Sequence, residues 1–369
     1  MSLPEGLLTG AYTYSARVDS WLGSQWLGQV PVAGGSVSWT VGQQVQGTLS
    51  LTVPRYGAAS EAENARDFTP DHPEAPLACF GQELQVTVTV TSLVDGSEYT
   101  EPAGRFIIIS SETDTDTVTV SAKSLLHRTE ENRLVSLTVP RTGGTLASEI
   151  RRLIGTQMGV VIDEALTDRA CPSSMSWGES RIDAVYEIAD AWPARLREGR
   201  DGVLYLLPPA DEITTAPVRV LTDGVDGTVI GVKRSWTREQ VYNRVVARGQ
   251  DTDDAGRPTF QAVASQTSGP LSVTGPYGIV TRFWSSPLVT SQAIAARSAQ
   301  TMLASSIRRA TTIPVELAPD PSLQLDEPVR LYSHDVIGAA PVELWGRVAA
   351  VELPLLYTGA ARVDVAIDT

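Results

Sequence analysis

The sequence predicts an α+β protein rich in β-strand, in which two similar antiparallel, tube- or barrel-like β domains flank a smaller α+β domain. Three observations support this prediction. Apolar and polar residues alternate in short runs through the first and last thirds of the chain, as in half-buried strands. The middle third has apolar residues at helical spacing. A strand and turn pattern of the first third also recurs near the end. We therefore expect domains at residues 1–130, 131–223 and 224–369.

The first domain is a series of strands separated by turns. Clean alternation in Ser36–Val41 and Thr48–Val53 predicts strands with one wet face. The polar, proline-containing stretch 55–76 predicts a long surface loop. Asp95-Gly96 is typical of a hairpin turn. The expected strands are 16–21, 36–41, 47–53, 83–91, 104–110 and 117–121.

The middle domain combines two helices with a hairpin. Thr145 is placed to cap a helix that follows two glycines. Ser180 and Asp183 fit a capping box at the start of a second helix, which Pro193 ends. Strands at 194–198 and 203–207 then close around Asp201-Gly202.

The last domain contains a long helix among strands. Its expected strands are 228–236, 241–249, 260–266, 278–284, 312–317, 329–332, 344–353 and 362–367. Ser291–Arg309 has six apolar residues on one helical face, namely Ile294, Ala295, Ala299, Met302, Leu303 and Ile307. We expect this helix to lie against the antiparallel sheet formed by the last four strands.

The end of the chain repeats the pattern of its beginning in three successive strands, and a chance match of two meanders explains the letters as well as a duplication does. Gly104-Arg105 and Gly346-Arg347 each open the middle strand of a set. In the strand before it, Glu83–Val88 takes the place of Glu327–Leu331. A true duplication would give two superposable β units.

Composition limits the classes of function. The 369 residues carry a formal net charge of −14, which argues against a nucleic-acid reader because such proteins neutralise phosphates. The same charge is compatible with a surface past which nucleic acid slides. Cys79 and Cys171 make no disulfide or zinc set, and we expect both to be buried free thiols. Residues 1–15 lack a basic start and a long apolar run, so we do not expect a signal peptide, and the longest apolar runs of the sequence are too short to predict a membrane span.

No catalytic, cofactor-binding or metal-binding residues are expected, and the chain is not predicted to be an enzyme. The three histidines, His72, His127 and His334, have no motif around them. Asp251–Asp254 begins like a calcium loop, but Ala255 and Ala262 stand where ligands belong, so a solvated hairpin is expected. The acids at 112, 114 and 116 predict a second solvated turn. The eight tryptophans are expected in cores or interfaces, with a sugar platform as the alternative.

The order of these patterns resembles the tail-tip or baseplate hub proteins of tailed bacteriophages, the late-control hub family. The stretches that carry the resemblance are Ser36–Val53, Pro76–Val88, Ala103–Ile108, Asp183–Pro208, Val241–Gly249 with Asn243-Arg244, and Ala293–Tyr332 with the turn Asp320-Pro321-Ser322-Leu323. One departure is that many relatives have Gly-Asp before the valine of the following strand, whereas this chain has Asp326-Glu327-Pro328-Val329.

The resemblance implies a homotrimer whose paired β domains imitate a sixfold tail tube. It implies a distal tail protein, a tape measure protein and tail fibre or receptor-binding proteins as partners, with DNA passing through the ring. It places the chain at the tail tip of the virion, assembled in the bacterial host cytoplasm. The family has no catalytic site in these domains, and the added lysozyme or peptidase domain of some relatives is not expected after Thr369. The alternatives are a hexameric distal tail ring protein and a carbohydrate-binding or carbohydrate-cleaving β protein.

Overall fold

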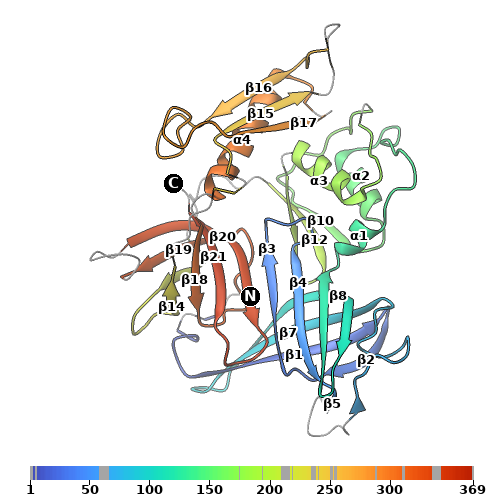
Figure 1. The fold of residues 1–369 in the computed structure, drawn as a ribbon, viewed down its shortest axis with the longest axis vertical. Coiled ribbons are helices and arrows are strands. Elements are labelled where there is room, and N and C mark those ends of the chain that lie inside the picture. The colour runs from blue at the N-terminus through green and yellow to red at the C-terminus, as the bar shows by residue number, and fades with distance from the viewer. Residues whose placement is uncertain are drawn as a thin grey trace.

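A sheet of 13 strands dominates the fold of the computed structural model (Figure 1). The structure describes residues 3–4, 6–57, 66–173, 175–192, 194–208, 217, 219–233, 238–239, 241–249, 252, 256–286, 289–309, 312–334 and 342–367. Apart from the parallel pair β13–β19, the strands of this sheet pair antiparallel. The predicted β-rich α+β class is therefore confirmed.

The first β unit is built from the N-terminal third of the chain. Its strands are β1 (Tyr12–Leu22), β2 (Gln25–Val30), β3 (Gly34–Thr40), β4 (Gly47–Pro54), β7 (Gln82–Ser92), β8 (Glu98–Thr113) and β9 (Thr117–Ser124). A short pair, β5 (Tyr56–Gly57) and β6 (Arg66–Asp67), lies in the predicted surface loop. The unit's strand order is β3-β4-β9-β8-β7-β1-β2, and its alternating apolar side chains are buried on one face.

The second β unit, built from strands after residue 218, repeats the order of the first five strands, whereas its sixth strand pairs parallel instead of antiparallel. Its strands are β13 (Arg219–Thr222), β14 (Val229–Val232), β18 (Thr312–Leu317), β19 (Pro328–Ser333), β20 (Val342–Pro354) and β21 (Ala361–Ile367). They run β14-β18-β21-β20-β19-β13. The buried side chains of both units belong to one hydrophobic core.

The two units also share the register of their central strands. Alternate apolar residues of β4 face β9 just as those of β18 face β21. The matched pairs are Leu49–Ala122 with Ile313–Val365, Leu51–Val120 with Val315–Val363, and Val53–Val118 with Leu317–Ala361. The stretches Thr48–Val53 and Thr312–Leu317 are therefore structural equivalents.

A bulge fixes the equivalence of the long strands. The register of β8 against β9 shifts between Ile108 and Ser110, and that of β20 against β21 shifts between Val348 and Ala350. Counting from the bulges, Gly346 matches Phe106 and not Gly104. The predicted alignment of the two Gly-Arg pairs is thus wrong by two residues, and both pairs lie inside their strands rather than opening them.

The turn before β7 and β19 agrees with the register set by the bulges. Gly81 has φ 104° and its equivalent Asp326 has φ 65°, the one non-glycine residue at positive φ among the described residues. A left-handed residue is required at this point in both units. This explains the departure from the hub-protein pattern, since aspartate here occupies the place of a glycine.

The middle part packs two helices on a small sheet and has its own core. Its elements are α1 (His127–Glu131), α2 (Leu146–Ile154), β10 (Gly159–Ile162), α3 (Arg181–Ala191), β11 (Arg195–Glu198) and β12 (Val203–Leu207). Thr145 caps α2 in a capping box with Ser148, and the Ser180 side chain accepts from the Asp183 N–H at the start of α3. Both predicted N-caps are confirmed.

A further module interrupts the second β unit. It consists of β15 (Arg244–Gly249), β16 (Gln261–Ser265), β17 (Thr281–Ser286) and α4 (Gln292–Arg309), inserted between β14 and β18. The helix lies where it was predicted, with Ala295, Ala299 and Leu303 buried. However, it packs on β15 and β16 and only touches β21, so the predicted placement against the last four strands is wrong.

The division of the chain at residues 130 and 223 remains a prediction, because one sheet joins strands of the first and last parts. The predicted strand 228–236 is described as Val229–Val232. Asp251, Asp253 and Asp254 of the expected acidic turn lie outside the described residues, as does Trp236.

Candidate functional site

The feature that organises this molecule is the seam between the two β units. β3 pairs antiparallel with the second half of β20, from Thr40 opposite Ala350 to Ser36 opposite Pro354. Val41 N–H donates to Ala349 O at 3.0 Å and so extends the ladder by a further bond. Through this pairing the units form one continuous sheet, in which β20 lies beside β3 (Figure 1).

Next to the seam, the close approach of β3 to its other neighbour, β4, depends on a glycine. Gly35 has φ 126°, and a Cβ there would lie 2.1 Å from Ser50 O, closer than atoms can approach. Its carbonyl accepts from Leu355 N–H at 3.0 Å. Beneath the ladder, Val351 and Leu353 are fully buried. Burying an apolar side chain of this size stabilises the folded state by about 1.5–3 kcal/mol.

Two aromatic side chains make buried hydrogen bonds beside the seam, and one of these bonds crosses it. Trp39 Nε1 donates to Ala103 O at 2.9 Å, and its ring packs on Phe106 with centroids 5.6 Å apart. Tyr14 Oη, from β1, donates to Pro354 O at 2.7 Å, and burial raises the pKa of this phenol. The first unit therefore contacts β20 through two strands, β3 by its backbone ladder and β1 by the Tyr14 hydrogen bond.

A buried arginine of the middle part reaches into the second unit. Arg200 stands at the tip of the β11–β12 hairpin and donates to the carbonyls of Pro321 and Leu323. Burial lowers the pKa of this guanidinium to about 10, while the carboxylates of Glu327 and Asp320 oppose that shift. A buried cation with two carbonyl acceptors fixes the hairpin against the turn before β19.

The same hairpin is fixed to the first unit through Glu198. Its carboxylate accepts from Ser124 Oγ at 2.5 Å and from Leu126 N–H at 2.9 Å. Burial raises the pKa of Glu198 to about 7, against the effect of those donors. Gln46 completes the contact, because Glu198 N–H donates to Gln46 Oε1 at 2.8 Å. One hairpin thus connects both β units.

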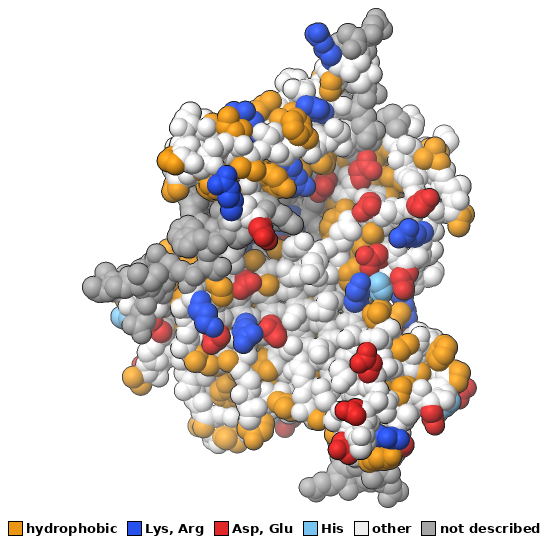
Figure 2. All heavy atoms as spheres, viewed as in Figure 1, with side chains coloured by type: hydrophobic (Ala, Val, Ile, Leu, Met, Phe, Trp, Pro, Cys, Tyr) orange, Lys and Arg blue, Asp and Glu red, His pale blue; other side chains and the backbone are white. Residues whose placement is uncertain are grey.

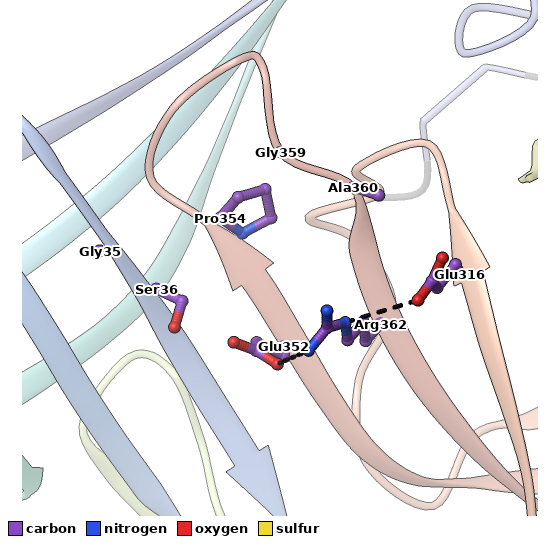
Figure 3. A pocket seen from close by; sticks show the side chains of 8 residues that line it. All are labelled: Gly35, Ser36, Glu316, Glu352, Pro354, Gly359, Ala360 and Arg362. Carbon is purple, nitrogen blue, oxygen red and sulfur yellow. Dashed lines mark ion pairs between the residues drawn. The ribbon is translucent and has the colours of Figure 1, made fainter.

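A surface hollow of about 370 Å³ lies on the seam, among β3, β18, β20 and β21. Figure 3 shows Arg362 between Glu316 and Glu352, with N–O distances of 3.8 and 3.9 Å. Lys233 Nζ donates to Glu316 at 3.0 Å and lowers the pKa of that carboxyl. Arg362 therefore lies between the two acids of the hollow and is shared by both.

The described residues contain no group of His, Cys, Asp and Glu placed to hold a metal ion. In the same residues no helix is long and apolar enough to cross a membrane. The acids of the β8–β9 turn are exposed, as predicted for a solvated turn. Cys171 is buried, but Cys79 is exposed, so the expectation that both thiols are buried is wrong for Cys79.

Charge is unevenly distributed over the surface. Figure 2 shows acidic side chains prevailing over the middle part and the lower face of the first unit, while basic side chains gather on the inserted module. The sequence explains this, since residues 255–315 contain arginines and no acid. The strong net negative charge therefore belongs to the rest of the chain.

No family model matches the sequence, and no curated protein matches it. Solved structures do match in fold. The tail protein from Neisseria meningitidis MC58 superposes with a TM-score of 0.63 at 12% identity, covering 96% of this chain and 97% of that one. The 43 kDa tail protein of prophage MuSo2 from Shewanella oneidensis gives 0.59 at 14% identity, covering 96% and 100%.

A third likeness extends the comparison to another host. Prophage tail protein gp18 from Listeria monocytogenes EGD-e superposes with a TM-score of 0.53 at 10% identity, covering 96% of this chain and 94% of that one. These likenesses span nearly the full length of every chain concerned. The resemblance predicted from sequence is confirmed at the level of the fold, and this chain has the fold of prophage tail proteins.

Proposed function

We propose that this protein is the structural hub of a bacteriophage tail tip, where three copies form a ring of six similar β units. The observation that carries the proposal is the repeated order β3-β4-β9-β8-β7 and β14-β18-β21-β20-β19 within one chain. A trimer of such chains offers six near-equivalent surfaces to a sixfold tail tube. The repeated unit thereby resolves a mismatch between threefold and sixfold symmetry.

In this proposal the hub closes or extends the tail tube and attaches the proteins of the tip. Its partners are a distal tail protein, the tape measure protein and fibre or receptor-binding proteins. The net charge of −14 supports passage of DNA through the ring without retention, because like charges repel. The protein acts as a scaffold rather than an enzyme, in the tail tip of a virion assembled in the host cytoplasm.

The oligomeric mass of the purified chain tests this function. We expect native mass spectrometry to give a trimer, and negative-stain images to show a ring with six lobes around a central hole. A hexamer would favour a distal tail ring protein instead. A stable monomer that binds or cleaves cell-wall glycan would overturn the hub proposal in favour of a carbohydrate-directed protein.

A further inference from the structure

The small sheet of the inserted module is covered by its helix on one face only. The strand order is β16-β15-β17, and α4 packs on this sheet through Val245 and Ala247 of β15. Because side chains alternate along a strand, Arg244, Val246 and Arg248 of β15 point to the opposite face. We call this second face, with its neighbours on β16 and β17, the open face.

An apolar row crosses the middle of the open face. Val263 of β16 and Phe283 of β17 lie on either side of Val246 in the two ladders. Phe283 is 61% exposed and Val263 is 54% exposed, whereas Val246 between them is buried. Large apolar side chains from two strands therefore face water in one row, and grouped exposed apolar side chains mark interaction surfaces.

Two arginines border the apolar row. Arg244 and Arg248 come two residues before and after Val246, so they lie about 13 Å apart at about 3.3 Å per residue. Arg244 Nε donates to Ser265 Oγ at 3.2 Å. The Arg248 guanidinium stacks on the Phe283 ring at 4.6 Å from its centroid, and its Nε is buried without an acceptor among the described residues. Neither arginine forms an ion pair with a described acid, so both retain donors for a ligand.

The module supplies no acid around most of the open face. Two of its three strands and its helix belong to residues 255–315, which contain no aspartate or glutamate. Figure 2 shows basic side chains on the module, whereas acidic ones prevail elsewhere. A cationic face of this kind is complementary to a partner that carries negative charge.

The apolar row decides which kind of acidic partner fits. Nucleic acid presents a phosphate at every nucleotide and is held by a series of cations, whereas the open face separates its two arginines by an apolar row. Alternate side chains of an extended peptide are about 6.6 Å apart, the spacing of Arg244, Val246 and Arg248 along β15. A segment with an acid, an apolar residue and a second acid at alternate positions therefore matches the face.

We propose that the open face binds an extended acidic segment of a partner protein. Carboxylates of the segment pair with Arg244 and Arg248, a geometry that guanidinium groups favour, and the apolar side chain between them packs on Val263 and Phe283. This inference rests on the hub function proposed above and specifies where a protein of the tail tip attaches. The module has its own sheet at the top of Figure 1, so this binding leaves the large sheet free for contacts between subunits.

A labelled peptide that repeats Glu-Ser-Leu-Ser tests the proposal, because it places glutamate and leucine at alternate positions. Fluorescence anisotropy should show it binding to the purified full chain, more weakly as salt is raised. Arg248→Ser and Phe283→Ser should each raise Kd about tenfold. The matched control is Arg297→Ser, which removes the same charge from an exposed position of α4 and should change Kd less than about twofold.

Reversed charges keep the test decisive if a variant binds nothing. Arg244→Glu combined with Arg248→Glu should lose the glutamate peptide and bind a peptide that repeats Lys-Ser-Leu-Ser. Equal binding of the glutamate peptide by the wild type and Arg248→Ser would overturn the site. Equal binding of a peptide with the same composition but its glutamates in one block would overturn the match of spacing. Tighter binding of oligothymidylate would overturn a protein partner.

The oligomeric mass separates this proposal from the hub function. A trimer that does not bind the peptide would overturn the docking face and leave the hub function standing. A monomer that binds the peptide through Arg248 and Phe283 would overturn the ring and leave the docking face standing. A trimer that dissociates in Arg248→Ser would mean that a second copy covers the face, and would overturn a separate partner.

Discussion

Glu198 and Arg200 carry ionisable groups into the places where the middle part meets the two β units. Each is buried and each is held by donors or acceptors from a different unit. Such groups contribute little when satisfied but cost much when one partner is lost. They are therefore the positions at which a single substitution should loosen the attachment of the three parts.

The raised pKa of Glu198 predicts a pH-dependent stability. Its folded pKa of about 7 lies above the ordinary 4.5, so the folded state binds the proton more tightly than the unfolded state. The stabilisation is complete below pH 4.5 and is lost as the pH rises to 7, a change of about 3 kcal/mol. Glu198→Gln should remove this loss. Urea unfolding from pH 5 to 8 measures it, and parallel pH profiles of the two proteins would contradict it.

Arg200→Met should destabilise the protein by about 2–5 kcal/mol, because the carbonyls of Pro321 and Leu323 would be left buried without donors. Denaturant unfolding gives the free energy. Arg133→Met is the matched control, since the Arg133 side chain is 73% exposed and its ion pair with Glu179 is 3.9 Å long. Equal stability of the two variants would show that Arg200 does not hold the hairpin.

At the scale of elements, the inserted module is a small folded body with its own core. Val245 and Ala247 of β15 pack against Ala299 and Leu303 of α4, and none of these residues belongs to the core of the large sheet. The module enters and leaves the second unit between β14 and β18, where the first unit has the short hairpin between β3 and β4. We expect it to loosen independently of the large sheet.

Leu303→Ala should therefore act locally. Removing a buried leucine side chain costs about 2–5 kcal/mol, which should speed amide hydrogen exchange in β15, β16 and α4 while β4 and β9 keep their protection. Thr301→Ala, at an exposed position of the same helix, is the control and should change neither region. Faster exchange throughout the large sheet would mean that the module and the sheet unfold together.

Elements were predictable where the signal lies in neighbouring residues. The helix at Ser291–Arg309 and the cap at Thr145 follow from spacing and from one side chain. The sheet against which α4 packs was not predictable, because the apolar face of a helix does not specify which sheet it packs on. The register of the repeat was misplaced for a related reason. The two Gly-Arg pairs are conspicuous in the sequence but are not equivalent in the structure. The equivalent residues are the alternating ones in Thr48–Val53 and Thr312–Leu317.

At the scale of the whole molecule, the seam was beyond reach of the sequence. Thr40 and Ala350 pair across almost the entire chain, and nothing local to either selects the other. The sequence likewise does not predict that Phe80 is 70% exposed, because this follows only from the fold.

Assembly should make thermal stability depend on protein concentration. A ring that binds folded chains, but not unfolded ones, raises Tm as the concentration rises. In scanning fluorimetry we expect Tm to rise steadily, by several degrees, as the protein concentration is raised a hundredfold. A Tm that is the same at every concentration for the wild type would contradict a reversible ring.

The module between β14 and β18 has a consequence for the outline of such a ring. Six equivalent corners would alternate between a short hairpin and a domain rich in arginine. The face toward the tube would keep its pseudo-sixfold symmetry, while the three arginine-rich modules would lie around the rim with threefold symmetry. One protein would then offer a sixfold binding surface to the hexameric tube and a threefold binding surface to the proteins attached beyond it.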